Sequence, residues 1–172
     1  MFKIDDPIIH PTRGAGIITA FIERSVKGET IRYYQIEMLG ETALQLFLPV
    51  EKAALLGIRR AIPSEQLPRI WEILQSPPVE LPTNSRKRYR MLKEKLLTAD
   101  TLQIAEIVRD IVSERQADGS LKTRDRNIYL ESLNFLSGEI AAAQGVELSA
   151  ARALVKGKIN REQPSVKTSA PA

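Results

Sequence analysis

One short segment of the chain carries the residue types of a polyanion-binding site. Between Arg86 and Lys95, six of ten residues are Lys or Arg and only Glu94 is acidic. Cationic side chains at this density suit contacts to the phosphates of a nucleic acid, where the binding free energy comes mainly from counterion release. We interpret residues 83–97 as a helix, which would hold these side chains in fixed positions.

The spacing of the basic residues puts four of them on one face of this helix. At about 100° per residue, the shared face carries Arg86, Lys87, Arg90 and Lys93. An apolar stripe lies almost next to it and contains Tyr89, Leu92 and Leu96, with Ser85 joining it at the start. A cationic stripe of this kind contacts phosphates without reading bases. A solvated helix surface is the alternative, and Arg124 and Arg126 on a later helix could extend the patch.

The net positive charge of the chain lies in its second half. The 172 residues carry a net charge of +4. Residues 1–78 contain nine Lys/Arg and nine Asp/Glu, whereas residues 79–172 contain sixteen and twelve. A neutral half followed by a basic half predicts that only the second half meets a polyanion.

Residue patterns typical of enzymes are absent from the sequence. His10 is the only histidine, and a lone histidine without a positioned partner is more often structural than catalytic. Gly14-Ala15-Gly16 lacks the third glycine of a dinucleotide-binding turn. The chain has no cysteine, and Asp5 and Asp6 occupy the place of a signal peptide's apolar run. We therefore expect a cytoplasmic monomer that is not an enzyme, with no cofactor, no metal, no small-molecule substrate and no membrane partner.

The first 62 residues have the pattern of short strands. Apolar and β-branched runs at 7–11, 17–22, 31–38 and 44–49 alternate with glycine-containing turns, which predicts a small bent sheet or a partial barrel. Phe47 lies between Leu46 and Leu48, so its ring should point to the opposite face of its strand. An exposed Phe47 beside an unpaired strand edge would form a protein-docking surface, whereas a barrel would bury both faces. Both alternatives stay open here.

From residue 63 onward the apolar period becomes helical, so the fold class is α+β with an all-helical second part. Leu67, Ile70, Trp71 and Leu74 share one helical face, and a proline-rich linker follows over 76–82. We predict a sheet domain over 1–62, a helix and linker over 63–81, and a helical DNA-binding domain over 82–159. Residues 160–172 lack apolar periodicity, which favours disorder.

Several segments, taken in their order and spacing, resemble the CarD/CdnL family of bacterial transcription regulators. The first half contributes Phe2-Lys3-Ile4-Asp5-Asp6, His10-Pro11-Thr12-Arg13-Gly14, Ile22 to Gly28, Leu48 to Glu51 and Gly57-Ile58-Arg59. The second half contributes Pro82-Thr83-Asn84, Arg88-Tyr89, Ala105 to Asp110 and Gly138-Glu139-Ile140. The resemblance covers about residues 2 to 145.

This resemblance implies a Tudor-like N-terminal domain that binds the β subunit of RNA polymerase. The implied polymerase contacts are Arg24, Ser25 and Val26, with Phe47 at a position that is basic in the family. The resemblance also implies a helical domain that touches promoter DNA at the upstream edge of the open bubble and stabilises the open complex. The implied basic DNA contacts fall on Lys87, Arg88, Arg90 and Arg126, and the basic face adds Arg86 and Lys93.

Two positions depart from the family pattern. A tryptophan normally follows the Pro-Thr-Asn segment and acts as a wedge in the minor groove, but Ser85 stands there, and a serine cannot unstack a base step. Asn127 replaces a usual arginine. The sequence therefore leaves two hypotheses, a transcription regulator that docks on polymerase and holds promoter DNA through the 86–95 helix, and a protein-interaction module that docks on polymerase or another partner without productive DNA contact. By binding RNA polymerase, the protein would associate with the nucleoid.

Overall fold

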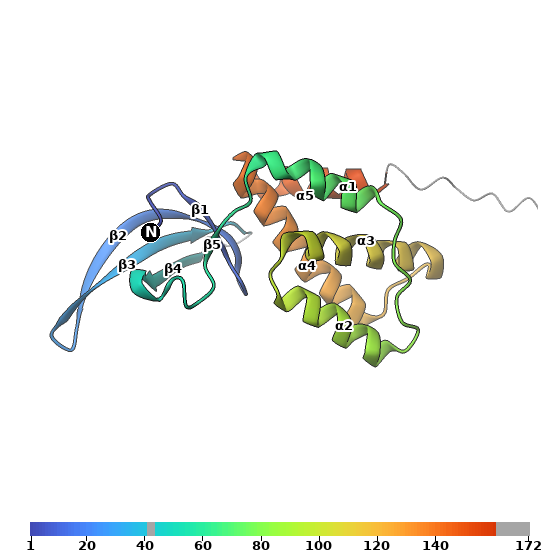
Figure 1. Ribbon diagram of the computed structural model, residues 1–172, viewed down its shortest axis with the longest axis horizontal. Helices are drawn as coiled ribbons and strands as arrows, with labels where there is room; N and C mark the ends of the chain where they lie inside the picture. Colours follow the sequence, from blue (N-terminus) through green and yellow to red (C-terminus); the bar gives the residue numbers. More distant parts are fainter. Residues whose placement is uncertain (41–43, 161–172) are drawn as a thin grey trace, which may run out of the picture.

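A computed structural model describes residues 1–40 and 44–160 of the chain. A sheet lies at one end of the molecule and a group of helices at the other (Figure 1). The predicted α+β class, with strands first and helices after them, is confirmed. The predicted disordered tail lies outside the described residues from position 161 onward.

The sheet has five antiparallel strands in the order β4-β3-β2-β1-β5. Their bounds are β1 Pro7–His10, β2 Gly14–Val26, β3 Glu29–Met38, β4 Leu44–Pro49 and β5 Arg59–Arg60. The two ends of the sheet do not meet, so it is open and not a barrel. β3 pairs over its whole length with β2, from Gly16 to Val26, and the two strands extend past the others as a long hairpin (Figure 1).

Two local features shape the long hairpin. The register between β2 and β3 shifts by one residue between Ile18 and Ala20, a bulge that increases the local twist and bends the strand. The hairpin turns at Lys27 and Gly28, whose φ angles of 54° and 85° lie in the left-handed region that glycine adopts at no steric cost. The hairpin therefore curves away from the rest of the sheet.

The two faces of the sheet belong to different cores. One face buries a cluster of its own, formed by Ile8, Ile18, Tyr34, Ile36, Met38, Leu48, Ala53 and Ile58. On the opposite face, Ile9 and Ala15 belong to the core of the helical part. Alternation along each strand produces this division, since neighbouring residues such as Ile8 and Ile9 point to opposite faces.

Five α-helices follow the sheet. They are α1 Leu67–Gln75, α2 Ser85–Leu97, α3 Thr101–Asp118, α4 Thr123–Gln144 and α5 Leu148–Asn160, and two short 3₁₀ turns lie at Val50–Lys52 and Ser64–Gln66. Asp100 caps α3, since its carboxylate accepts a hydrogen bond from the Gln103 N–H at 2.9 Å. α1 contributes Leu67, Ile70 and Leu74 to the helical core.

Sheet and helices meet at a close contact between β2 and α4. A Cβ added to Gly138 would lie 3.2 Å from the Cβ of Ala15, which is tighter than ordinary van der Waals contact. The missing side chain of Gly138 therefore lets α4 approach the sheet directly. Glu139 follows Gly138, and its side chain is fully buried at the same junction.

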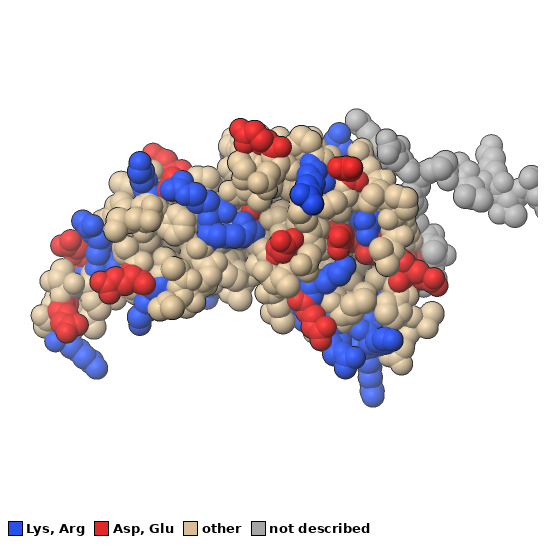
Figure 2. All heavy atoms as spheres, viewed as in Figure 1, with Lys and Arg blue, Asp and Glu red and all other residues tan. Residues whose placement is uncertain are grey.

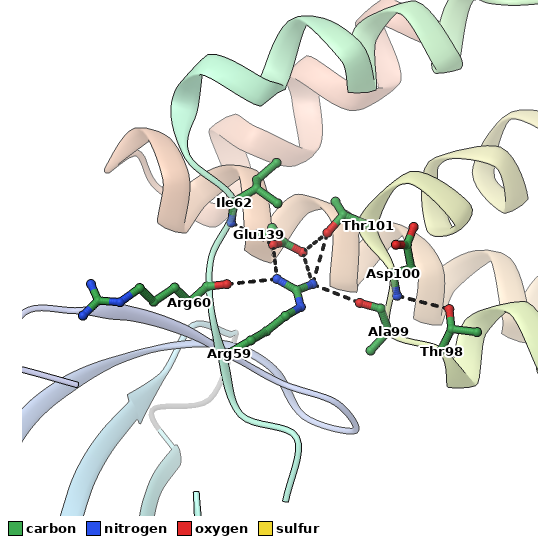
Figure 3. A network of polar contacts seen from close by, with 8 residues as sticks. All are labelled: Arg59, Arg60, Ile62, Thr98, Ala99, Asp100, Thr101 and Glu139. Carbon is green, nitrogen blue, oxygen red and sulfur yellow. Dashed lines mark hydrogen bonds and ion pairs between the residues drawn. The ribbon is translucent and has the colours of Figure 1, made fainter. Parts of the chain in front are cut away.

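Glu139 is the common acceptor of a polar network across this junction (Figure 3). The Arg59 guanidinium donates to both of its carboxylate oxygens, at 2.6 and 2.9 Å. The Ile62 N–H and the Thr101 hydroxyl also donate to it, at 3.0 and 2.5 Å. Arg59 in turn donates to the Ala99 carbonyl at 2.9 Å. The network thus connects β5, the segment after it, the start of α3 and α4, and holds the sheet against the helices.

Candidate functional sites

The start of α2 presents its first basic side chains to solvent. Asn84 caps the helix, and its side-chain oxygen accepts hydrogen bonds from the backbone N–H groups of Arg86 and Lys87 at 3.1 Å each. Ser85, Arg86 and Lys87 are exposed. The positive end of the helix dipole adds to the charge of these side chains. This end of α2 can therefore attract an anionic group.

Further along α2 the cations have acidic partners. Lys93 contacts Glu131 at 3.0 Å, Lys95 contacts Glu106 at 2.8 Å, and Arg90 lies 3.9 Å from Glu94. Within the described part of the chain, no ion pair involves Arg86 or Lys87. The positive potential of the helix is thus concentrated at its first turn. In Figure 2, Lys and Arg side chains gather at the lower end of the molecule, where α2 begins in Figure 1.

Arg88 lies in the interior, although it is in the middle of the basic segment. Its side chain is only 3% exposed. The guanidinium donates two hydrogen bonds to one oxygen of Asp125, at 3.1 and 2.7 Å, and one to the Pro82 carbonyl at 2.9 Å. Glu114 lies 3.4 Å away. In this position Arg88 fixes α2 to α4 and the linker, and its guanidinium does not face a phosphate outside.

The two arginines expected to extend the basic patch lie on different flanks of α4. The Arg124 guanidinium is 5.6 Å from the centroid of the Tyr89 ring on α2, which adds it to the α2 surface. Arg126 instead lines a cavity with Arg115 of α3 and Lys156 of α5. Residues two positions apart in the sequence, such as Arg124 and Arg126, point about 200° apart around a helix. Arg124 is thus next to the α2 cations, and Arg126 is not.

On the sheet, three of the four expected polymerase contacts share one face. The strand register places Phe47 on the same face of the sheet as Gln35 and Ala20. Because side chains alternate along β2, Arg24 and Val26 point to this face too. The Arg24 guanidinium lies 4.5 Å from the centroid of the Phe47 ring. Phe47 and Val26 remain 36% and 39% exposed, which favours the docking-surface alternative for Phe47. Ser25 points to the opposite face.

The outer edge of β2 is open over its second half. β1 pairs with β2 only over Gly14–Ile17, and the Asp6 carbonyl accepts a hydrogen bond from the Ile18 N–H beyond it. Among the described strands, no partner pairs with that side of β2 from Thr19 to Val26. An unpaired strand edge can accept an additional strand from another chain. Arg24 and Val26 lie directly on this edge strand.

Among the described residues, the remaining polar groups give no indication of catalytic chemistry. Burial and the nearby Arg13 lower the pKa of His10, whose Nδ1 is 3.2 Å from the backbone nitrogen of Thr12. This neutral, hydrogen-bonded ring fits the structural interpretation of His10. In the described residues no three His, Cys, Asp or Glu side chains come close enough to hold a metal ion. The same residues include no helix with the length and apolarity needed to cross a membrane.

Family models match both parts of the chain. A model of the CarD C-terminal domain matches residues 69–156, and a model of the CarD-like/TRCF RID domain matches residues 2–62. The chain belongs to the CarD family. It is also similar to YdeB of Bacillus subtilis (strain 168), named as a candidate transcription factor, with 27% identity over 146 residues, which are 85% of this chain and 94% of that protein. The family is of a transcription-factor type and is not an enzyme family.

One exposed position departs from what the family resemblance implies. The matched C-terminal region includes Ser85, the position for which the family resemblance implies a tryptophan. Its hydroxyl is exposed at the first position of α2, next to Arg86 and Lys87. A side chain at this point would be the first to meet DNA lying across the end of the helix. Serine offers a hydrogen-bonding hydroxyl there and no apolar surface.

Two features of the CarD-family sites were not anticipated from the sequence. The buried role of Arg88 was missed, although at about 100° per residue it falls 40° from Leu92, close to the apolar stripe. That proximity was an available signal. The open edge of β2 had no such signal, because it depends on where β1 ends against β2, and the sequence of β2 alone does not show it.

Proposed function

We propose that the chain is a non-enzymatic transcription regulator that docks on the β subunit of RNA polymerase and contacts promoter DNA. The sheet is the docking part and the first turn of α2 is the DNA contact. Membership in the CarD family supports the class, and the RID domain match supports an interaction with polymerase. The observation that carries the DNA part is the unpaired, exposed pair Arg86 and Lys87 at the positive end of α2.

The proposed DNA contact is to the backbone. Arg86 and Lys87, with Arg124 beside Tyr89, supply cations that would neutralise phosphates near the upstream fork of the bubble. We keep Arg90 and Lys93 among the proposed DNA contacts as secondary ones, because each must leave its acidic partner before it can bind a phosphate. Ser85 can add a hydrogen bond to phosphate but no wedge. The expected action is to slow bubble collapse by charge neutralisation alone.

The proposed polymerase contact uses the open edge of β2. A strand of the β subunit would pair with residues 19–26 and meet Arg24 and Val26, while Phe47, two strands further in on β4, would be contacted over the exposed face of the sheet. Arg24 stacks on Phe47, so the pair offers an aromatic and a guanidinium group, the types that dominate interface energetics. Ser25 would contribute through its backbone, since its side chain points away.

The DNA proposal predicts a change in salt dependence for the double variant Arg86→Ala, Lys87→Ala. Each lost phosphate contact should lower the slope of log K against log salt by about 0.9, so the double variant should lose nearly two units of slope. Affinity at low salt should fall about equally for unrelated DNA sequences. Fluorescence anisotropy with labelled forked duplexes at several salt concentrations measures both.

The matched control is Arg90→Ala, Lys93→Ala, two positions on the same helix. Lys93 is paired with Glu131 at 3.0 Å and Arg90 lies 3.9 Å from Glu94, so this variant should change the slope by less. If it changes the slope as much as Arg86→Ala, Lys87→Ala does, the start of α2 is not the main contact. An unchanged slope in both variants would exclude α2 as the DNA surface.

The polymerase proposal predicts loss of docking for Arg24→Glu and Phe47→Ala. Truncation of a central aromatic or arginine at an interface typically costs about 2 kcal/mol or more, which corresponds to roughly thirtyfold in affinity. Interferometry with immobilised core polymerase measures it. The control is Arg32→Glu on the same hairpin, because Arg32 lies over Phe21 on the opposite face. Equal losses for Arg24→Glu and Arg32→Glu would mean that the proposed face is not specific.

The lifetime of the open complex on a model promoter tests the whole proposal. The chain should lengthen it, and Arg86→Ala, Lys87→Ala should remove most of that effect while polymerase binding is retained. The exposed Ser85 and the paired cations of α2 favour a second candidate function, a protein-interaction module that docks without productive DNA contact. That function predicts tight polymerase binding with an unchanged open-complex lifetime.

A further inference from the structure

A second group of cations lies on the other flank of α4, around a cavity of about 570 Å³. Arg115 comes from the last turn of α3, Arg126 from the first turns of α4 and Lys156 from α5. Three helices separated in sequence thus direct positive side chains at one space. Its volume lies in the range of small-molecule sites, about 300–1,000 Å³.

Like Arg86 and Lys87, these cations have no acidic partner among the described residues. In the described parts of the chain, no ion pair or hydrogen bond involves the side chain of Arg115, Arg126 or Lys156, and no described acidic residue lines the cavity. A bound anion would supply acceptors for two guanidinium groups and one ammonium group.

The floor of the cavity is apolar and carries one phenol. Leu133 and Ile159 are buried beneath it, and Leu121 is half-buried at its side. Tyr129 is half-buried in the same lining, and burial raises the pKa of its hydroxyl even though Arg115 acts in the opposite direction. Tyr129 therefore stays protonated at neutral pH and can donate a hydrogen bond. A ligand that fits has an anionic part and a flat apolar part.

We propose that this cavity binds a free nucleotide. Its phosphates would lie among Arg115, Arg126 and Lys156, and its base would rest on the apolar floor beside Tyr129. Clustered cations around a bounded cavity match the clustered charge of a di- or triphosphate, whereas a DNA backbone spreads its charge along a line. The cavity is also on the opposite flank of α4 from Arg124 and the start of α2, so nucleotide and promoter DNA would occupy separate sites.

Isothermal titration calorimetry of the full chain with ATP, GTP and inorganic phosphate tests this proposal. A nucleoside triphosphate should bind, inorganic phosphate should bind at least tenfold more weakly, and Arg126→Ala, Lys156→Ala should lose at least tenfold in nucleotide affinity. Both side chains are exposed, so the variant should keep the wild-type melting temperature. Tyr129→Phe should weaken binding and leave the floor intact.

The matched control is Arg86→Ala, Lys87→Ala, which removes the same charge from the other flank and should leave nucleotide affinity unchanged. If the control loses as much nucleotide affinity, the effect is one of net charge, and the assignment of the cavity as a nucleotide site is overturned. No binding of either nucleotide at millimolar concentration would also overturn it, as would phosphate binding as tightly as ATP. If Arg126→Ala, Lys156→Ala instead weakens only duplex DNA, the cavity is part of the DNA surface and not a nucleotide site.

Discussion

Glu139→Ala is expected to lower the free energy of unfolding by about 2–4 kcal/mol, because it removes a fully buried carboxylate that accepts several hydrogen bonds. The variant leaves the Arg59 guanidinium, the Ile62 N–H and the Thr101 hydroxyl without their common acceptor. Buried donors without partners add to the loss. Urea denaturation followed by circular dichroism gives the free energy, and fluorescence of Trp71, which packs against the helical core, reports on that core.

Glu106→Ala is the control for this prediction. Glu106 also accepts from a basic side chain, Lys95 at 2.8 Å, but both partners are about one third exposed. Partly exposed pairs of this kind contribute about 0–1 kcal/mol. A loss for Glu139→Ala no larger than that for Glu106→Ala would show that the junction does not depend on the network in Figure 3.

The same residue connects stability to the proposed function. The proposed docking face and the proposed DNA contact lie in different parts of the chain, and the Arg59–Glu139 pair and the Gly138–Ala15 contact join those parts. A softer junction would leave each surface intact but would let their separation vary. Glu139→Gln, at a temperature where it is folded, should therefore bind polymerase and DNA normally and shorten the open-complex lifetime.

Local patterns were enough to predict the elements but not their packing. The change from a strand-like period to a helical one near residue 63 predicted the α+β order, and proline and glycine marked most of the boundaries. β5 was missed because two residues, Arg59 and Arg60, carry no period. They pair with Ile8 and Ile9, some fifty positions away, and only the folding of the intervening chain brings the two segments together. The open shape of the sheet likewise depends on strand lengths that local patterns do not set.

For the site residues too, local sequence predicted positions on a helix but not the contacts that packing creates. The cationic face was predicted from spacing, because Arg86, Lys87 and Arg90 need only a helix to share a side. The electrostatic state of Lys93 and Lys95 was not predicted, because the acids that pair with them, Glu131 and Glu106, are 38 and 11 positions away. Which cations remain available for a ligand is therefore a property of packing. This is also why Arg126 could be assigned to the α2 patch from sequence and yet lie on the other flank of α4.

Arg88→Ala is the second variant with a large expected effect, a loss of about 3–5 kcal/mol in the free energy of unfolding. Asp125 would remain buried with its charge uncompensated, and the Pro82 carbonyl would lose its donor. α2 is held to α4 by this pair, so its first turn should loosen. DNA binding should fall as a consequence of that loosening, although Arg88 itself is not exposed to DNA. Urea denaturation and hydrogen exchange at 85–92 measure the two effects.

A double-mutant cycle separates this structural role from a direct DNA contact. Arg88→Ala, Asp125→Ala removes both charges, so it should recover part of the stability lost in Arg88→Ala, and the coupling should be about 1–3 kcal/mol. If Arg88 acts through the position of α2, DNA affinity should recover in parallel with stability. Arg86→Ala should instead weaken DNA binding with no change in stability. A stable Arg88→Ala protein that still loses DNA affinity would contradict the structural role and return Arg88 to the DNA-contact set.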